Sequence, residues 1–461
     1  MITIPYQPFH YQEEFHKDPA RFKIIAGGRR VGKTKCATHE AIRHCLTTPD
    51  RLVLWVAPTF RESREVGFSE FISVLDYLQP AIHSIHSSQL YTIFKNGSKI
   101  YWKSSDNPDS LRGRSITLAV LDEAAFHKET VFDAIIRPSL SDRKGRAILL
   151  STPNGFNYFH KIYTEAAGWS KYHWATEINP IIGQEEIDQV KSQISQVDFD
   201  QEYLAKFITK AGRVYADFGR ENTLSEFQIK PEVWDIYLGM DFGYASPTAI
   251  AFIGVDRATK TQVVQFDELY LTRTQIDDII NAIFDTLHKH GLKPNDLSTA
   301  FTDPAGNAEE LSSGISPVDA MRARGIHVVN KASSIQSGLA LVRSFIKNVK
   351  GERRYRVTQK CKETIRSFEG YQYAVDKWDN PIDDPLKDGD HDHMMDAVRY
   401  FFVNKFDHAR WVAQTPDQRP YTMGSSSCRV MKRCTSCKRP FISSTPKGEP
   451  PHICKECRSN V

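Results

Sequence analysis

A glycine-rich motif ending in lysine and threonine stands near the start of the chain, directly after a short apolar run. Residues 27–34 read Gly-Gly-Arg-Arg-Val-Gly-Lys-Thr, which fits the pattern G-x-x-x-x-G-K-[ST]. Glycines let the backbone curl so that successive N–H groups point at phosphate oxygens, and Lys33 would reach the β- and γ-phosphates while Thr34 ligates Mg²⁺. The motif predicts an ATP-binding loop, with a basic turn that binds no nucleotide as the alternative. The loop consists of Gly27, Gly28, Arg29, Arg30, Val31, Gly32, Lys33 and Thr34.

A pair of acids follows a second apolar run, Leu118–Leu121. Such a run is typical of a buried parallel strand, whose carboxyl end would meet the phosphates. We expect Asp122 to hold the Mg²⁺ shell and Glu123 to orient and deprotonate the attacking water. Acids often end strands, so the pair gains this meaning only beside the phosphate loop. Together the two motifs predict hydrolysis of ATP and not binding alone.

Three weaker features fit the same chemistry, and each has a plain structural alternative. Residues 151–155, Ser-Thr-Pro-Asn-Gly, follow an apolar run and could sense the γ-phosphate, or form an ordinary strand-to-turn junction. Gln12 could read an adenine edge, or lie on the surface. Phosphoryl transfer also uses a mobile positive charge in its transition state. Its candidates, each of which could instead be structural or DNA-facing, are Arg29, Arg30, Arg112 and Arg114.

The elements that must position these residues alternate along the first 210 residues. Apolar runs at 22–26, 52–57, 118–121 and 147–150 are separated by helical patterns such as 35–45. This alternation predicts a parallel sheet with helices on its faces.

The second half of the chain shows a different pattern after an irregular stretch over 211–234. Three successive strands with short turns are expected at 236–242, 248–255 and 262–270, as an antiparallel meander. Helical and strand segments then alternate to about residue 406.

Composition limits the class of protein. The 461 residues carry a net charge of +4, with 40% hydrophobic and 25% charged residues, as in ordinary globular proteins. The longer charge-free apolar stretches fall short of the ~20 residues of a membrane span, and no signal peptide is expected. Eight cysteines are too few for a disulfide scaffold, which indicates a reducing, intracellular compartment. From Cys428 onward, eight basic residues face two acidic ones, which suggests a polyanion contact or a solvated tail.

The sequences GGRRVGKT, LAVLDEAA and STPNG, together with Leu111-Arg112-Gly113, resemble the ATPase half of the large terminase subunit of tailed double-stranded DNA phages and prophages. The resemblance covers about residues 5–405 and implies a second half with a ribonuclease H-like nuclease. The implied fold class is α/β, with a P-loop NTPase parallel-sheet domain and a mixed-sheet nuclease domain. We expect the ATPase domain over 1–212, a linker over 213–234, the nuclease domain over 235–408, a linker over 409–427 and a small zinc-binding module over 428–461.

The second half carries the acids that a two-metal nuclease needs. Asp241 lies in the first strand of the meander, Asp303 ends a later apolar run, and Asp396 lies on an expected helix over 390–402. The resemblance implies that these three aspartates bind Mg²⁺ or Mn²⁺ and that His393 is a further ligand or a proton carrier. Oxygen-only ligation suits these metals better than zinc. Asp392 is a weaker candidate.

A cysteine cluster departs from the family pattern. Two C-x-x-C pairs, separated by sixteen residues, fit tetrahedral Zn²⁺, with labile disulfides or an iron–sulfur cluster as alternatives. The expected zinc ligands are Cys434, Cys437, Cys454 and Cys457. Surrounding basic residues favour a DNA-binding role, ahead of docking on a capsid or portal protein and of a structural clip.

The combined hypothesis is an ATP-driven motor that packages viral DNA and a two-metal endonuclease that cuts concatemers, working in the host cytoplasm. The resemblance implies double-stranded DNA, a portal and procapsid, and a small terminase subunit as partners, with a ring of subunits on the portal. In a ring, Arg112 could act on the ATP of the neighbouring subunit. Two rivals stay open: a helicase–nuclease of DNA repair or recombination, and an assembly scaffold whose nuclease half is inert.

Overall fold

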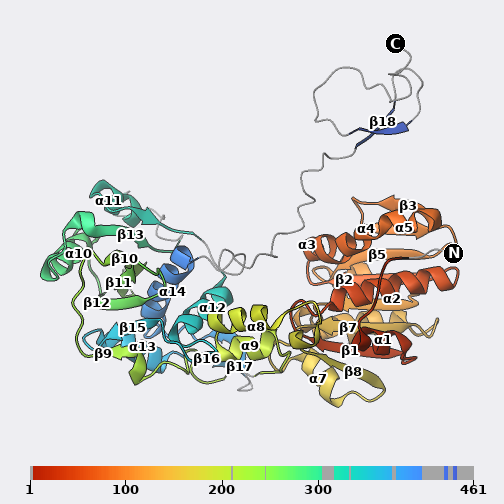
Figure 1. Ribbon diagram of the computed structural model, residues 1–461, viewed down its shortest axis with the longest axis horizontal. Helices are drawn as coiled ribbons and strands as arrows, with labels where there is room; N and C mark the ends of the chain where they lie inside the picture. The colour runs from red at the N-terminus through yellow and green to blue at the C-terminus, as the bar shows by residue number, and fades with distance from the viewer. Residues whose placement is uncertain are drawn as a thin grey trace, which may run out of the picture. The chain divides into compact units, whose positions relative to one another are not determined.

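The computed structural model describes residues 4–208, 211–243, 246–303, 316–331, 334–375, 381–406, 430–433 and 440–443. The chain forms two compact units, residues 1–405 and 406–461. The first unit contains two large sheets, and the described part of the second contains one antiparallel hairpin (Figure 1).

The sheet of the N-terminal half has eight strands in the order β3-β4-β5-β2-β6-β7-β1-β8. The strands from β5 to β8 in this order pair in parallel, whereas β3, β4 and β5 form an antiparallel edge that the expected all-parallel sheet lacked. The strands are β1 (Phe22–Gly27), β2 (Leu52–Ala57), β3 (Ile82–His86), β4 (Tyr91–Phe94), β5 (Lys99–Ser104), β6 (Leu118–Asp122), β7 (Arg146–Ser151) and β8 (Trp169–Trp174).

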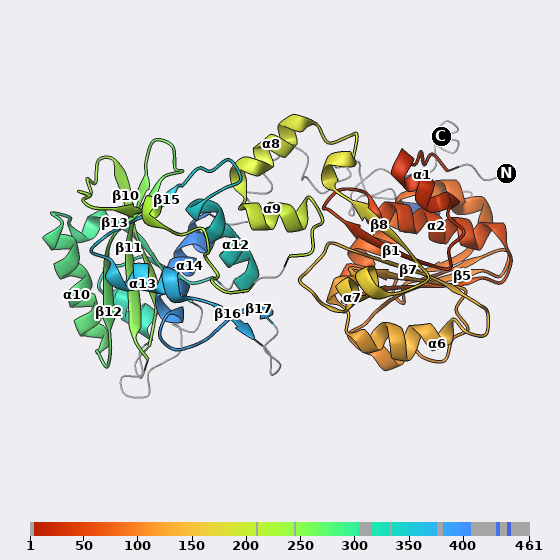
Figure 2. The same ribbon diagram turned by 90° about the horizontal axis from the view of Figure 1, so that it is seen from below.

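Helices cover both faces of this sheet, which explains why its central strands are apolar along their whole length. Figure 2 shows α1 and α2 on one face and α6 and α7 on the other. Two separate cores result, one around Trp55 and Phe71 and the other around Leu121 and Phe159. The α-helices of this half are α1 (His10–Lys17), α2 (Lys33–Thr47), α3 (Phe60–Glu62), α4 (Ser69–Ser73), α5 (Leu75–Leu78), α6 (Arg137–Ser139), α7 (Tyr158–Glu165), α8 (Gln184–Gln193) and α9 (Gln196–Glu202).

The second sheet has seven strands in the order β14-β13-β10-β11-β12-β15-β9. Its centre is the expected antiparallel meander, flanked by parallel neighbours on both sides. The mixed sheet predicted for this half is therefore confirmed. The strands are β9 (Thr223–Leu224), β10 (Trp234–Asp241), β11 (Thr248–Asp256), β12 (Val263–Leu271), β13 (Leu297–Phe301), β14 (Val328–Val329) and β15 (Tyr355–Thr358).

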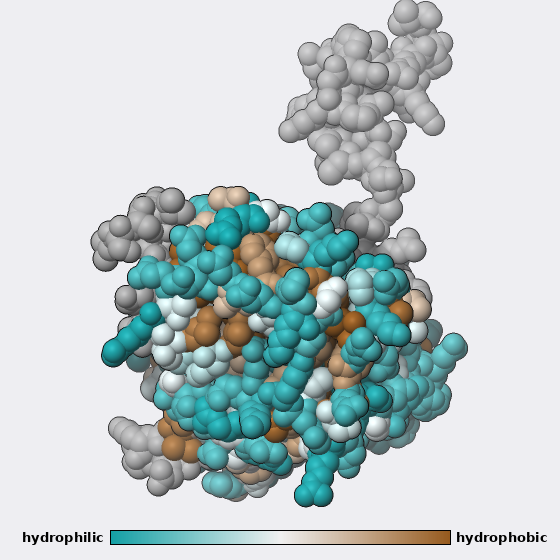
Figure 3. Space-filling model, turned by 90° about the vertical axis from the view of Figure 1, so that its left-hand side faces the viewer, coloured by the Kyte–Doolittle hydropathy of each residue, from teal (hydrophilic) through white to brown (hydrophobic). Residues whose placement is uncertain are grey.

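Helices also sandwich the second sheet. Helix α10 buries its apolar stripe, Ile279, Ile280, Ile283 and Leu287, on one face, and its polar side is exposed. Hydrophilic side chains predominate on the surface of this part of the molecule (Figure 3). The other elements are α10 (Ile276–Lys289), α11 (Pro317–Ala323), α12 (Ile335–Ile346), α13 (Lys362–Gly370), α14 (Asp392–Phe406) and the hairpins β16 (Tyr373–Val375) with β17 (Pro381–Pro385) and β18 (Val430–Arg433) with β19 (Pro440–Ser443).

Helix α14 lies unusually close to β10, because Gly239 has no side chain. A Cβ at Gly239 would lie 2.3 Å from the carbonyl oxygen of Ala397. The close approach brings the helix that carries Asp396 against the strand that ends in Asp241.

The stretch expected as a linker, residues 213–234, is structurally part of the second half. Strand β9 pairs with β15, and the N–H of Val214 donates to the carbonyl oxygen of Tyr371. Tyr215 and Phe218 are buried. A two-residue strand and isolated aromatics have no periodicity that a sequence pattern could reveal, which is why the segment looked irregular.

Candidate functional site

The phosphate loop joins β1 to α2 as the sequence predicts. The loop ends at Gly32, whose φ of +86° is accessible at low cost only to glycine, and α2 begins at Lys33. Within the loop, Val31 is fully buried and Arg30 is exposed. The carboxyl ends of β1, β6 and β7 therefore meet the N-terminus of α2, a place where backbone N–H groups favour anions.

Lys33 points back into the curl of the loop. Its ammonium donates to the carbonyl oxygens of Gly27 at 2.7 Å and Gly28 at 3.0 Å, and to Thr152 Oγ1 at 3.2 Å. Burial lowers the pKa of Lys33, against the opposing effect of the acids Glu123 and Asp122. Thr152 belongs to the predicted Ser-Thr-Pro-Asn-Gly segment, which thus reaches the phosphate loop.

The two acids of β6 lie beside the loop. Thr34 Oγ1 donates to Asp122 Oδ2 at 3.5 Å, and Ser151 Oγ donates to Glu123 Oε2 at 3.0 Å. Burial and the neighbouring charge of Glu123 raise the pKa of Asp122 to about 7. Glu123 itself has φ +49° and ψ +50°, a left-handed conformation that is uncommon outside glycine.

A segment far along the chain braces the phosphate loop. The N–H of Gly28 donates to the carbonyl oxygen of Trp174, Thr176 Oγ1 donates to that of Arg29, and Asn179 Nδ2 donates to that of Arg30. Sequence reasoning missed Thr176 and Asn179, because nothing local marks residues that contact a loop about 150 positions away.

Two of the predicted nucleotide residues already have partners in the protein. Arg29 Nε lies 2.5 Å from Glu202 Oε2, another residue that the sequence did not reveal. Gln12 is buried, its Nε2 donates to the carbonyl oxygen of Gly32 at 3.3 Å, and its Oε1 accepts from the N–H of Phe9 at 3.0 Å. In this structure both side chains support the loop, and a direct contact with nucleotide stays a prediction.

Two of the four candidate arginine fingers, Arg112 and Arg114, lie in the segment between β5 and β6. Arg112 is exposed and forms an ion pair with Asp109 at 2.8 Å. Arg114 donates to the carbonyl oxygen of Ser110 at 2.8 Å, and its guanidinium lies over the ring of Tyr101. Both guanidiniums are held at the surface by short-range contacts.

The acids of the second half come from three elements. Asp241 ends β10, Asp303 follows β13, and Asp396 lies on α14. His393 Nδ1 donates to Asp241 Oδ2 at 2.8 Å, and this bond raises the pKa of His393. Burial raises the pKa of Asp241 against that bond, and the charges of Asp396 and Asp303 raise it further. The structure therefore brings the predicted acids of this half into one electrostatic group.

Two basic side chains that the sequence did not reveal form ion pairs with the carboxylate of Asp396. Lys387 contacts Asp396 Oδ2, and Arg399 donates to Asp396 Oδ1 through Nη2 at 2.9 Å and Nε at 3.1 Å. Asp392 is buried, and its Oδ1 has no hydrogen-bond partner. Within the described residues, no three or more His, Cys, Asp or Glu side chains form a group that could hold a metal ion as they stand.

The cysteines predicted to bind zinc, namely Cys434, Cys437, Cys454 and Cys457, lie outside the described residues.

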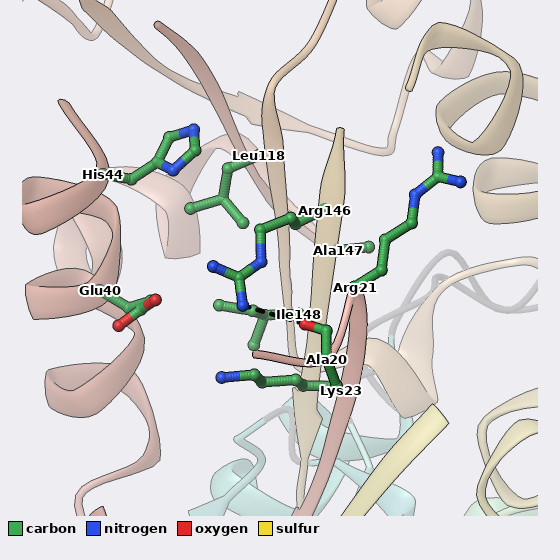
Figure 4. A pocket seen from close by; sticks show the side chains of 9 residues that line it. All are labelled: Ala20, Arg21, Lys23, Glu40, His44, Leu118, Arg146, Ala147 and Ile148. Atoms are coloured by element: carbon green, nitrogen blue, oxygen red, sulfur yellow. Dashed lines mark hydrogen bonds between the residues drawn. The ribbon is translucent and has the colours of Figure 1, made fainter. Parts of the chain in front are cut away.

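A small pocket lies at the opposite edge of the eight-stranded sheet from the phosphate loop, where β1, β6 and β7 begin (Figure 4). Buried Lys23 and Glu40 face it, and Arg146 Nη2 donates to the carbonyl oxygen of Ala20 at 3.0 Å. Glu40 also accepts hydrogen bonds from His16 and Arg43, which lower its pKa to about 2 although burial alone would raise it. The lining residues are Ala20, Arg21, Lys23, Glu40, His44, Leu118, Arg146, Ala147 and Ile148.

Among the helices that the structure describes, none is both long and apolar enough to cross a membrane.

Comparison with known proteins finds that the chain is similar to large terminase subunits. A family model of the N-terminal region of the T4likevirus-type terminase large subunit matches residues 24–221. The large terminase subunit of Escherichia phage T5 is 24% identical over 402 residues, covering 83% of this chain and 87% of the relative. That of Thermus phage G20c is 28% identical over 182 residues, covering 36% of this chain and 37% of the relative.

Solved structures show the same fold. The large terminase of a thermophilic bacteriophage superposes with a TM-score of 0.63 at 16% identity, covering 86% of this chain and 99% of the other. That terminase has also been solved with ADP and with ATP-γ-S, and these structures match with TM-scores of 0.61 and 0.60. At this level of identity, the likeness is one of fold.

Proposed function

We propose that the chain is a phage large terminase subunit, an ATP-driven motor that moves double-stranded DNA into a procapsid and cuts concatemeric DNA with a two-metal endonuclease. One observation carries the proposal: a single chain holds both a phosphate loop facing the acids of β6 and a separate acidic group at the end of β10. Each site has the residue types that its reaction needs, and each lies at the carboxyl end of a central strand.

The N-terminal site supports ATP hydrolysis. Lys33 and the loop N–H groups would bind the phosphates, and Glu123, with its carboxylate held by Ser151, would orient and deprotonate the attacking water. Thr34 Oγ1 and Asp122 Oδ2 lie 3.5 Å apart, and a hydroxyl beside a carboxylate is a donor set that fits Mg²⁺. A bound Mg²⁺ would neutralise charge on the phosphates.

The second site supports metal-dependent cleavage of a phosphodiester. Asp241, Asp303 and Asp396 offer oxygen donors, which fit Mg²⁺ or Mn²⁺. Asp392 lies one helical turn before Asp396, shares the contact with Lys387, and has a buried Oδ1 without a hydrogen-bond partner, so it is a further candidate donor. Metal ions there would activate water and stabilise the leaving oxygen. His393 holds Asp241 in place and can carry a proton. Lys387 would have to give up its contact with Asp396 Oδ2 to a metal.

The finer assignments belong to the same proposal. The ATPase domain occupies residues 1–212, the nuclease domain 235–408 with the preceding segment 213–234 packed on it, and the zinc module 428–461 after a linker over 409–427. Zinc held by the four cysteines would supply most of the folding energy of so short a module, which would bind DNA through its basic residues.

The partners follow from the family and from the exposed arginines. Double-stranded DNA, a portal and procapsid, and a small terminase subunit are the proposed partners, with a ring of subunits on the portal in the host cytoplasm. Arg112 is exposed and would have to give up its ion pair with Asp109 to act on the ATP of a neighbouring subunit. Mixing Arg112→Ala chains with wild type should then lower the ATPase rate more than in proportion, and a linear loss would contradict the role in trans.

An encapsidation assay tests the whole proposal. Purified chain, empty procapsids with portal, small subunit, linear duplex DNA and ATP should yield DNA that resists added nuclease, and Lys33→Ala should abolish this protection. A helicase–nuclease would instead separate the strands, which a fluorophore–quencher duplex detects. Strand separation without protection would overturn the motor and favour the repair enzyme.

Nicking of supercoiled plasmid by the full chain in Mn²⁺ tests the nuclease half. Asp303→Ala should abolish nicking. Absence of nicking by the wild-type chain in both Mg²⁺ and Mn²⁺ would favour the inert scaffold.

A further inference from the structure

His127 lies at the carboxyl edge of the eight-stranded sheet, one turn beyond the acids of β6. The 3₁₀ turn η4 (Ala124–Phe126) folds the chain back, so that His127 Nε2 lies 2.9 Å from the carbonyl oxygen of Asp122. The other ring nitrogen, Nδ1, lies 2.8 Å from Ser105 Oγ. His127 is 9% exposed, whereas its neighbour Phe126 is 57% exposed. The imidazole is therefore buried together with Ala124 and Ala125, and Phe126 is the exposed residue of the turn.

A carbonyl oxygen only accepts, so Nε2 carries a proton. Ser105 Oγ lies 2.8 Å from Nδ1 and 3.3 Å from the carbonyl oxygen of Pro58, so its one hydrogen has two acceptors, of which Nδ1 is the nearer. Burial lowers the pKa of His127, which favours the neutral form of the ring. Ser105 is itself tied down, because its N–H donates to the carbonyl oxygen of Ala57, the last residue of β2, at 3.0 Å. The ring thus bridges the ends of β6, β2 and β5.

The hydrogen bond from His127 holds the peptide between Asp122 and Glu123, and this peptide sets the backbone conformation of Glu123. That peptide is held at both ends: its carbonyl oxygen accepts from His127, and its N–H donates to Asp122 Oδ1 at 3.1 Å. The left-handed conformation of Glu123 is unfavourable for a residue with a Cβ and persists only where the surroundings hold it. Rotation of this peptide would release Glu123 to an ordinary conformation and turn its carboxylate away from Ser151.

The other end of the bridge is the base of the segment that carries the surface arginines. Ser105 follows β5 directly and begins the connection to β6, along which Arg112 and Arg114 lie. His127 therefore joins the acids of β6 to the base of the arginine segment by two hydrogen bonds.

We propose that His127 is a positioning residue for ATP hydrolysis, which holds the Asp122–Glu123 peptide against Ser105 and so fixes the direction of the Glu123 carboxylate. This inference rests on the proposed ATPase function and goes beyond it, because the histidine acts on the Asp122–Glu123 peptide and through it on the carboxylate. Its effect should appear in turnover and not in nucleotide binding, since Lys33 and Thr34 keep their contacts.

ATPase assays on the full chain test the role. His127→Leu removes both hydrogen bonds at similar volume and should lower kcat about 10- to 100-fold, with KM for ATP changed less than about twofold. His127→Gln can still donate to the Asp122 carbonyl and should keep kcat within about fivefold of wild type. An unchanged kcat in His127→Leu, a matching rise in KM, or a loss in His127→Gln equal to that in His127→Leu would overturn the proposal.

A double substitution separates positioning from a general effect on the fold. Once Glu123→Ala has removed the base, His127→Leu should change the residual rate less than about twofold, because there is no carboxylate left to position. An equal fall in both backgrounds would contradict the role.

Hydrogen–deuterium exchange of the full chain provides a readout that does not need turnover. Residues 122–127 and 105–112 should lose protection in His127→Leu and keep it in His127→Gln, with α10, which packs on the second sheet, as the internal control. Unchanged exchange in His127→Leu would overturn the bridge. A wild-type chain without ATPase activity would overturn the proposed function, and the exchange measurement would still decide whether His127 holds the peptide.

Discussion

The two candidate sites differ in where along the chain their charged residues come from and in which groups the basic side chains contact. In the ATPase half the acids are neighbours in the sequence, Asp122 and Glu123, and the cation Lys33 lies on backbone carbonyls of its own loop. In the nuclease half the acids come from three distant elements. One of these acids, Asp396, forms ion pairs with both Lys387 and Arg399. The first site is a local motif, whereas the second exists only once the sheet and α14 have assembled.

This difference determines how each site tolerates change. A local motif depends on the backbone of one loop and on the segment that braces it. An assembled site depends on the packing between elements, so a small displacement of α14 would separate Asp396 from Asp241. We therefore expect substitutions to affect one activity and spare the other.

The largest expected effect is that one substitution abolishes ATPase activity and spares nicking, whereas another abolishes nicking and spares ATPase activity. Lys33→Ala should lower ATPase activity about a thousandfold or more, because the phosphates lose their main cation, while plasmid nicking stays within about twofold. Asp303→Ala should do the reverse. Both rates are measured on the same preparations of full chain, and a loss of both activities in either variant would contradict independent sites.

A matched pair of glycine substitutions sharpens the same comparison. A Cβ at Gly28 would lie 2.4 Å from the carbonyl oxygen of Tyr203, and one at Gly239 would lie 2.3 Å from that of Ala397. Displacement of about 1 Å can cost about 100-fold in rate, so Gly28→Ala should reduce ATPase activity and Gly239→Ala should reduce nicking by about that factor.

Gly183→Ala is the control for this pair, because nothing lies within 4 Å of its Cβ position and its φ is −69°. It should leave both rates unchanged. Equal damage to both activities from Gly239→Ala would indicate general unfolding and not a displaced helix.

The acid stability of the ATPase half depends on Glu40. Because its pKa is about 2 in the folded chain and about 4.5 when unfolded, the ionised group stabilises the fold above pH 4.5, and this stabilisation is lost as the pH falls toward 2. Glu40→Gln should therefore lower the free energy of unfolding by about 3 kcal/mol at pH 7 and by less at pH 3.

Urea unfolding at the two pH values measures this effect. Glu13→Gln, whose half-exposed side chain on α1 pairs with the exposed Lys17, serves as the control and should change stability by less than about 0.5 kcal/mol. A loss in Glu40→Gln that is the same at both pH values would mean that the ion pairs with His16 and Arg43 do not stabilise the fold.

The smallest expected effect concerns Arg29. Its ion pair with Glu202 is largely exposed on the arginine side, and such pairs contribute about 0–1 kcal/mol. Arg29→Ala and Glu202→Ala should each change KM for ATP less than about threefold. A rise above about tenfold in Arg29→Ala alone would show that its guanidinium binds nucleotide.

The sequence revealed the local parts of the molecule and missed those made by distant contacts. The phosphate loop, the acids of β6 and the central strands follow from apolar runs and spacing, because each is specified within about ten residues. Asp241, Asp303 and Asp396 needed the family resemblance to be grouped. Thr176, Asn179 and Lys387 could not be identified, since their roles depend on segments that meet only in the folded chain.

The pairing of β9 with β15 has a practical consequence for dividing the protein. A recombinant nuclease fragment that begins after Leu224 would lack this strand and would leave the backbone N–H and C=O groups of β15 unpaired at the sheet border. Uncovered borders of this kind recruit other chains, so such a fragment should precipitate. A fragment that begins at Ala211 keeps β9 paired with β15, and it also keeps the buried rings of Tyr215 and Phe218.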